Sequence, residues 1–472
     1  MKTAVFYIAL LFSLSVEGQI TSGLNDTVLI KGVVISGRAK DAALAGFKKI
    51  KLDSLDIKEC LTSSVADILS VNTTIFVKSF GPGTSSTSSS RGTGANHTLI
   101  AWNGIKINNP MLGQSDLSLL PSGLMDEVHI YQGGGSMELQ SGGLGSAVNL
   151  LTMPEWNRKT NVSIGTSAGT YGRLNLLAKL STGSKNFHSI TRLFSAYSKN
   201  NFLYSDPYTV SEKNWLRREN SQMRQNVFIQ ELYFRKPQHQ FSAKLWYQKA
   251  DRNIPVPVIV SQLRPGEKQT DESVRALFNY DYYPGAENLN LCLAILSDRL
   301  DYSNPPASID SRNKMITGVF KGSLTAPLTV KTKAKIQIEN NLNAVKSNNY
   351  ETQKINNILE IAFIAETFFS ERINTSVLLR EIVTNKKMLI PDFSAGIQLK
   401  TDNKNASFLK ANFSRNSRIP SLNDMFWLPG GNPDLKNEYG TTLEIGWETS
   451  GKKFSYLSYN FDITLFRSFI RE

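Results

Sequence analysis

The sequence predicts a mainly β fold, in which a small mixed α/β domain precedes a large antiparallel β-barrel of the transmembrane kind. The length of 472 residues exceeds what one ordinary core holds. Aromatic residues (24 Phe, 16 Tyr, 6 Trp) accompany 32 glycines, a mixture that favours strands and turns. From about residue 158, alternating segments of about ten residues follow one another. No run of eighteen apolar residues follows the N-terminal segment, so no membrane-spanning helix is expected.

Residues 1–18 have the pattern of a secretory signal peptide. Lys2 supplies the positive charge, Ala4–Val16 form an uncharged apolar stretch, and small residues end at Gly18. An anchor helix is the alternative, but the apolar stretch is short for one. We therefore expect an exported chain that begins near Gln19.

Residues 19–32 form a polar, flexible lead that contains one short β-prone run. A β-prone run on a flexible tether is suited to pairing with a strand of another protein. The alternative is that it forms the first strand of a domain. The run consists of Asp26, Thr27, Val28, Leu29 and Ile30.

Residues 33–153 are predicted to form a compact mixed α/β unit. Apolar spacing predicts a helix over 53–70, with a possible start near Ser63 and Ser64. The Gly-, Pro- and Ser-rich stretch 80–94 predicts a loop or a loop-edged strand. Asn103-Gly104, between two apolar runs, predicts a β-hairpin.

Residues 158–472 are predicted to form barrel strands. In Phe241–Gln248 alternate residues are apolar, as expected when lipid-facing and lumen-facing side chains alternate. Long connections (199–221 and 251–272) alternate with short ones (236–238 and 451–453). A soluble β-sandwich array is the alternative. The segments assigned to strands are Asn161–Ser167, Arg173–Leu180, Ser189–Ser198, Val227–Arg235, Gln240–Gln248, Leu289–Asp298, Met315–Leu324, Thr329–Glu339, Ile358–Ala365, Thr375–Ile382, Asp392–Leu399, Phe408–Ser414, Thr441–Trp447 and Tyr456–Phe466.

Composition argues against several other functions. The net charge of +13 comes from scattered Lys and Arg, so a solvated surface explains it better than nucleic-acid binding. The four histidines are dispersed, and no hydrolase or metalloprotease motif is present, so neither an enzyme nor a metal site or cofactor is predicted. Cys60 and Cys292 are expected to be free thiols, and a disulfide between them is the alternative.

Two groups of motifs resemble the TonB-dependent outer-membrane receptors. The first comprises Ser90-Arg91-Gly92, the Asn103-Gly104 hairpin and the glycine-rich ending at Val148-Asn149-Leu150. The second runs from Arg415 through Ile419-Pro420-Ser421 to Gly431-Asn432-Pro433. The resemblance implies a 22-stranded barrel with the α/β domain as a plug in its lumen.

The resemblance also implies a mechanism and a set of site residues. A small-molecule substrate would bind at the plug apex and the extracellular loops, and the periplasmic protein TonB would pair with the TonB box, Asp26–Ile30. Outer-membrane lipid would surround the barrel, with plug and TonB box facing the periplasm. Arg91 would pair with a carboxylate of the barrel wall. The implied structural residues of the plug are Arg91, Gly92, Asn103, Gly104, Gly142, Gly143 and Asn149, and the implied substrate residues are Ser85, Ser86, Thr87, Ser88, Asn108, Asn109 and Gln114.

The order of the plug motifs is most similar to the cobalamin receptors, so cobalamin is the expected substrate. Ferric-siderophore import is the alternative, and a non-transporting structural or adhesin barrel is the alternative of another class. Because the segments number about fifteen and the last ends at Glu472 without a terminal aromatic residue, we expect a C-terminally truncated barrel.

Overall fold

The computed structural model describes residues 44–81, 83–205, 215–257, 266–385, 387–402, 406–453 and 457–471. Residues 39–472 form one compact unit, and the description concerns this unit. The predicted signal peptide, the lead 19–32 and the TonB box Asp26–Ile30 lie outside the described residues. Within the described ranges, no helix is long and apolar enough to cross a membrane.

The plug, described over residues 44–153, is built on a five-stranded sheet. Its strand order is β1-β6-β7-β4-β5, in which β4 and β7 run parallel and the other neighbours antiparallel. The sheet and its helices enclose a buried apolar core. The elements are β1 (Lys49–Leu52), α2 (Ser54–Glu59), α3 (Val65–Asn72), β2 (Phe76–Ser79), β3 (Ser86–Ser89), η1 (Ala95–His97), β4 (Thr98–Trp102), β5 (Ile105–Lys106), η2 (Leu117–Leu119), η3 (Ser122–Leu124), β6 (Glu127–Gln132), η4 (Gly133–Glu138) and β7 (Ser146–Leu151).

The helix expected over 53–70 is two helices in the structure. The possible start near Ser63 and Ser64 is confirmed and is Ser64, because the Ser64 side chain accepts a hydrogen bond from the Asp67 amide. The Asp67 carboxylate in turn accepts one from the Ser64 amide. This reciprocal capping box holds Ser64 in an extended conformation, so helix α2 cannot continue into α3.

The expected hairpin at Asn103-Gly104 is confirmed. Ala101 pairs with Lys106 and Trp102 with Ile105, and both central residues have positive φ (49° and 81°). Two positive φ angles define the type I′ turn, whose twist matches that of the flanking strands.

Gly104→Ala is expected to cost about 1–2 kcal/mol of stability. A Cβ at Gly104 would have nothing within 4 Å, so the cost comes only from the left-handed backbone. Gly318→Ala is the matched control, because Gly318 is equally open but lacks a positive φ. Urea unfolding of both variants measures the difference, and equal midpoints would contradict this account of the turn.

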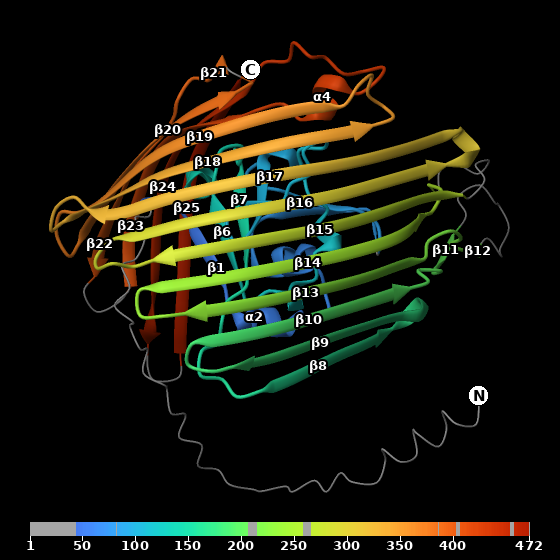
Figure 1. Cartoon of the computed structure of the whole chain (residues 1–472), viewed down its shortest axis with the longest axis horizontal. Helices are drawn as coiled ribbons and strands as arrows, with labels where there is room; N and C mark the ends of the chain where they lie inside the picture. Colours follow the sequence, from blue (N-terminus) through green and yellow to red (C-terminus); the bar gives the residue numbers. More distant parts are fainter. Residues whose placement is uncertain are drawn as a thin grey trace, which may run out of the picture. The chain divides into compact units, whose positions relative to one another are not determined.

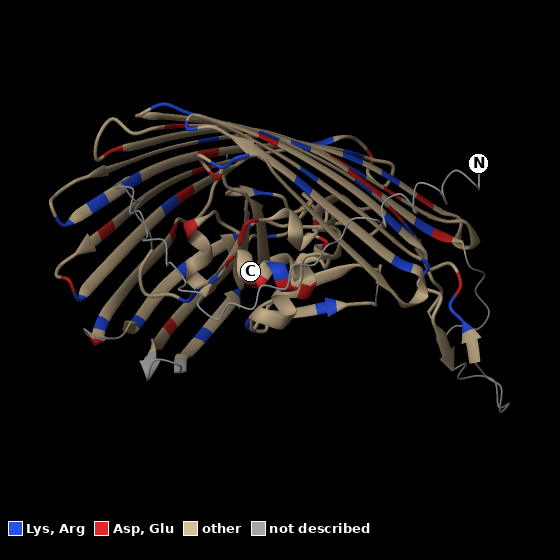
Figure 2. Cartoon of the chain, turned by 90° about the horizontal axis from the view of Figure 1, so that it is seen from below, with Lys and Arg blue, Asp and Glu red and all other residues tan. Residues whose placement is uncertain are grey.

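The rest of the described chain forms one large antiparallel sheet of 16 strands, with β8 and β25 at its two ends. The sheet curves around the plug, which lies on its concave side (Figures 1 and 2). Its strands are β8 (Asn161–Gly169), β9 (Arg173–Gly183), β10 (Phe187–Ser198), β13 (Met223–Arg235), β14 (His239–Ile254), β15 (Glu267–Tyr282), β16 (Asn288–Asn304), β17 (Ile309–Pro327), β18 (Thr332–Ser347), β19 (Lys354–Phe368), β20 (Ile373–Thr384), β21 (Lys387–Met388), β22 (Asp392–Asp402), β23 (Ala406–Arg418), β24 (Glu438–Lys453) and β25 (Leu457–Arg471). The connections carry η5 (Thr170–Gly172), β11 (Leu203–Ser205), β12 (Trp215–Arg217), η6 (Pro305–Ala307) and α4 (Leu422–Phe426).

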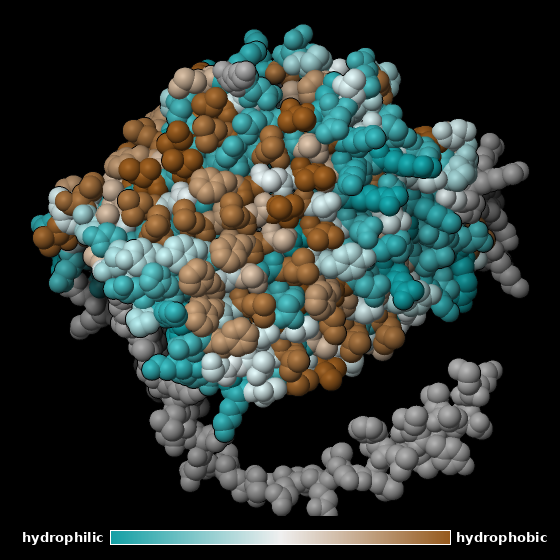
Figure 3. Space-filling view, viewed as in Figure 1, coloured by the Kyte–Doolittle hydropathy of each residue, from teal (hydrophilic) through white to brown (hydrophobic). Residues whose placement is uncertain are grey.

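Side chains of this wall sheet alternate between its outer face and the concave face that holds the plug. In β14, Ser242, Lys244 and Trp246 are buried toward the plug, whereas Ala243 and Leu245 face outward. The outward residues form a hydrophobic belt over the strands, and polar residues gather toward the end that carries β11 and β12 (Figure 3). This end carries the long connections, and the opposite end carries the short turns, as in transmembrane barrels.

The expectation of a long connection over 251–272 was wrong. Strand β14 continues to Ile254 and β15 already begins at Glu267, with Asp251 paired to Thr270. No strand was expected over 273–282 either. The first half of β15, Glu267–Ser273, is polar on both faces and therefore lacks the apolar alternation that marks a strand in lipid. Main-chain hydrogen bonds extend such strands without that pattern.

Candidate functional site

The plug is tied to the wall by buried ion pairs. Arg192 on β10 is 1% exposed, and its Nη2 lies 2.5 Å from Asp126 Oδ2 of the plug and 3.1 Å from Glu231 Oε2 of β13. Lys179 Nζ is 2.9 Å from Asp126 Oδ1. Burial acts to raise the pKa of Asp126, but Arg192 and Lys179 outweigh it and hold that pKa well below its usual range. The carboxylate therefore stays charged and anchors the plug.

A second anchor lies on the opposite part of the wall. Arg91 Nη1 is 2.8 Å from Glu444 Oε1 of β24, and Glu444 also accepts a hydrogen bond from the Gly134 amide. Arg91 thus contacts the kind of wall carboxylate that the resemblance implied. An added Cβ on Gly133 would overlap both Glu444 and Arg91, so the glycine permits this close approach.

Other plug residues named by the resemblance stabilise the plug internally or join it to the wall. The Asn149 side chain accepts a hydrogen bond from the Gly104 amide at 2.9 Å, which joins the hairpin to β7. Asn103 accepts one from Lys244 of β14, also at 2.9 Å. Gly92 and Gly142 have positive φ, and Gly143 packs where a Cβ would crowd Ser136.

The largest described cavity that both plug and wall line has a volume of about 490 Å³. It lies at the end of the barrel that carries the long connections, because the wall contributes residues from the adjoining ends of β15, β16 and β17. We call it the outer pocket. The plug contributes Ser85, Thr87, Leu119, Leu120 and the segments 107–112 (in part) and 114–116, and the connection between β23 and β24 contributes Asn423 and Trp427.

The charges around the outer pocket are paired. Arg252 bridges Asp116 of the plug at 2.6 Å and Asp271 of β15 at 2.7 Å. Arg275 pairs with Asp298 at 3.3 Å. The charges of the lining are therefore offset at contact, and its uncharged polar side chains are amides and hydroxyls, among them Asn109, Gln114 and Ser115.

The seven expected substrate residues divide between this pocket and the plug interior. Ser85, Thr87, Asn109 and Gln114 line the outer pocket. Ser86 and Ser88 do not line it, because β3 alternates and turns both into buried positions. Asn108 does not line it either: its side chain is bonded to Ile100, Thr98 and Gly113 and holds the loop in place.

The wall residues of the pocket were not predicted from the sequence. Arg275, Asp298, Tyr302 and Trp427 lie far apart in the chain, and only the barrel brings them together. The alternation of each strand was the one available signal, since it assigns every second side chain to the lumen.

Comparison with known proteins decides the family. The model of the TonB-dependent receptor plug domain matches residues 50–147, and that of the TonB-dependent receptor β-barrel matches residues 389–471. Both matched regions are those of a TonB-dependent receptor. Receptors of this family are outer-membrane proteins and not enzymes. Among the described residues, no group of three or more His, Cys, Asp or Glu is arranged to hold a metal ion.

One curated relative of this receptor is the vitamin B12 transporter BtuB of Vibrio vulnificus (strain YJ016). It is 22% identical over 467 residues, which cover 95% of this chain and 70% of the relative. Solved structures share the fold. The siderophore receptor PirA of Acinetobacter baumannii has a TM-score of 0.71 at 14% identity (90% of this chain, 70% of PirA). The alcaligin receptor FauA of Bordetella pertussis has 0.69 at 13% identity (92% and 73%).

Proposed function

We propose that this TonB-dependent receptor imports cobalamin. The observation that carries the proposal is the lining of the outer pocket, which is apolar in large part, has more amides and hydroxyls than charged groups, and has its charges paired. Each charged group of the lining has a counter-ion: Asp116 and Asp271 share Arg252, Asp298 pairs with Arg275, and Arg299 pairs with Asp301. Cobalamin is a corrin fringed with amides and carries little net charge, so this lining complements it.

A ferric siderophore is the second candidate. Many ferric siderophores are anionic and would need unpaired Arg or Lys in the pocket. The described lining offers no excess of positive charge. The relation to a protein named as a vitamin B12 transporter supports the same choice.

We further propose that TonB drives the import from the periplasm. TonB would add a strand to residues 26–30, which resemble the TonB box by position and composition. The short turns of the wall and the lead that precedes the plug would face the periplasm, and the outer pocket would face the exterior.

Equilibrium binding to the full chain in detergent tests the substrate. Cyanocobalamin is expected to bind saturably, and ferric enterobactin and ferrichrome are expected not to displace it. Saturable binding of a ferric siderophore with no binding of cyanocobalamin would overturn the cobalamin proposal in favour of the siderophore.

Leu112→Trp is expected to weaken cobalamin binding about tenfold or more. Leu112 is 41% exposed at the pocket, so the larger ring would occupy space that the ligand needs. Leu55→Trp is the control, because Leu55 is 68% exposed on α2 and does not line the pocket. Equal affinities for the two variants would place the ligand elsewhere.

A further inference from the structure

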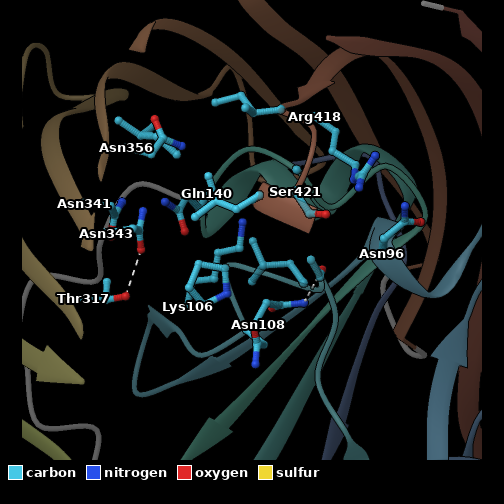
Figure 4. Close-up of a pocket in the computed structure, with 18 of the residues that line it drawn as sticks. Asn96, Lys106, Asn108, Gln140, Thr317, Asn341, Asn343, Asn356, Arg418 and Ser421 are labelled. Atoms are coloured by element: carbon cyan, nitrogen blue, oxygen red, sulfur yellow. Dashed lines mark hydrogen bonds between the residues drawn. The ribbon is translucent and has the colours of Figure 1, made fainter. Parts of the chain in front are cut away.

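A second cavity, of about 100 Å³, lies between the plug and the wall (Figure 4). It shares Ile107, Asn109 and Asp298 with the outer pocket, so the two cavities adjoin at the loop that follows β5. We call it the inner cavity. Its lining is rich in amides, from both the plug and strands β18 and β19.

Lys106, the last residue of β5, lines the inner cavity and has no counter-ion in contact. Among the residues that the structure describes, its ammonium makes neither a hydrogen bond nor an ion pair. Burial lowers the pKa of Lys106, and Arg418 lowers it too, whereas Glu360 and Glu339 oppose this from a distance.

The other charged groups around the inner cavity already have partners. Glu360 lies 3.3 Å from Arg380 Nε and accepts a hydrogen bond from Ser141 Oγ at 2.6 Å. Arg418 pairs with Glu438 at 2.7 Å. Since Asp298 pairs with Arg275 and Glu339 with Lys321, Lys106 adds a positive charge that no described neighbour cancels at contact.

Three buried amides present donors to the same space. Gln140 is 5% exposed and forms no hydrogen bond with any described residue, although it lines the cavity. Asn343 accepts a hydrogen bond from Thr317 at 2.8 Å through its oxygen, which leaves its NH₂ group free (Figure 4). Asn356 likewise accepts one from Thr384 at 3.2 Å. None of these donor atoms is fully enclosed, so each is accessible from the cavity and can donate to a bound group.

We propose that the inner cavity is an oxyanion-binding site that takes a carboxylate or phosphate group. The Lys106 ammonium supplies the charge, and the amides of Gln140, Asn343 and Asn356 supply hydrogen-bond donors around it. Charge-assisted hydrogen bonds to oxyanion oxygens are the strongest that this set of groups can form. The proposal stands on this geometry and does not depend on which nutrient the receptor imports.

Calorimetric titration of the detergent-solubilised full chain with inorganic phosphate tests the site. The wild-type chain is expected to bind phosphate saturably, and Lys106→Met is expected to weaken that binding about tenfold or more. Lys314→Met is the control, because Lys314 is exposed on the outer face of β17. Absence of saturable binding to the wild type, or binding that survives Lys106→Met, would overturn the proposal.

Asn343→Asp gives a second test that is independent of Lys106. Aspartate is the same shape, still accepts the hydrogen bond from Thr317, and places a carboxylate where the NH₂ group pointed. It is expected to abolish phosphate binding without lowering the unfolding midpoint, because the new carboxylate replaces the anion beside Lys106. Unchanged phosphate affinity in this folded variant would contradict the site.

Binding of cobalamin and of cobinamide identifies the source of the oxyanion. This test rests on the proposed function. Cobalamin carries a phosphodiester, which cobinamide lacks. If the imported molecule supplies the group, Lys106→Met weakens binding of cobalamin but not of cobinamide. If free phosphate supplies it, both corrinoids bind as before, and only phosphate binding is lost. Loss of both corrinoids with phosphate binding intact would contradict the site.

Discussion

Arg192→Met is expected to lower the free energy of unfolding by about 3 kcal/mol, because it leaves two buried carboxylates without their shared cation. Arg192 is 1% exposed and contacts Asp126 of the plug and Glu231 of the wall. The nearby Lys179 and Lys244 remain, at 2.9 Å from Asp126 and 3.9 Å from Glu231. Because these two lysines still offset part of the carboxylate charge, the expected loss of stability lies at the lower end of the range for broken buried ion pairs.

The loss should depend on pH. In the wild type the pKa of Asp126 is depressed, so its contribution is present above the unfolded pKa and is lost only in strong acid. Without Arg192, the burial that acts to raise this pKa is less opposed. Protonation of Asp126 then relieves the uncompensated charge, so the difference between variant and wild type should shrink as the pH falls from 7 to 4.

Urea unfolding in detergent, followed by tryptophan fluorescence at several pH values, measures both effects. Arg312→Met is the control, since the Arg312–Asp310 pair is largely exposed and should contribute little. Adding Asp126→Asn to Arg192→Met should recover part of the stability by removing one unpaired charge. A loss that is equal in the two arginine variants would show that the buried cluster does not anchor the plug.

The parts of the fold that the sequence predicts are those that local chemistry determines. Asn103-Gly104 specifies its turn by itself, because those two residues tolerate positive φ. Ser64 and Asp67 specify a helix start in the same way. The strands within the hydrophobic belt are predicted by alternation, because one face meets lipid.

The parts that the sequence does not predict depend on distant residues. The first half of β15 has no apolar face, and its extended form follows from pairing with β14 and β16. The outer pocket joins Thr87 of the plug to Tyr302 and Trp427 of the wall, and no spacing in the sequence relates them. The lack of a counter-ion at Lys106 cannot be predicted from the sequence either, because it depends on the positions of all its neighbours in the fold.

Deletion of residues 26–30 is expected to abolish energised uptake while leaving surface display and ligand binding unchanged. The outer pocket is built entirely from residues after position 84, so the deletion removes none of its lining. If TonB pulls on this run, a chain without it can bind its nutrient but cannot import it. Uptake of labelled cyanocobalamin by cells that lack another cobalamin receptor, with binding measured on the same cells, separates the two steps.

A pair of point variants tests the proposed pairing itself. Strand addition uses main-chain hydrogen bonds, so Leu29→Ala should retain most uptake. Leu29→Pro should reduce uptake about tenfold or more, because proline lacks the backbone N–H group and restricts the strand. Both variants replace the Leu29 side chain, but only proline removes the backbone N–H donor at this position.

The outcome also separates a transporter from a structural or adhesin barrel. A barrel that does not transport gains nothing from an N-terminal strand for a periplasmic partner, so neither the deletion nor Leu29→Pro would change its behaviour. Uptake that persists after the deletion would mean entry without TonB, and uptake absent from the unaltered chain would favour the non-transporting barrel. Because binding is measured separately, the two proposals fail in different ways. If the substrate proposal is wrong, cyanocobalamin does not bind. If the TonB proposal is wrong, binding is intact and neither the deletion nor Leu29→Pro changes uptake.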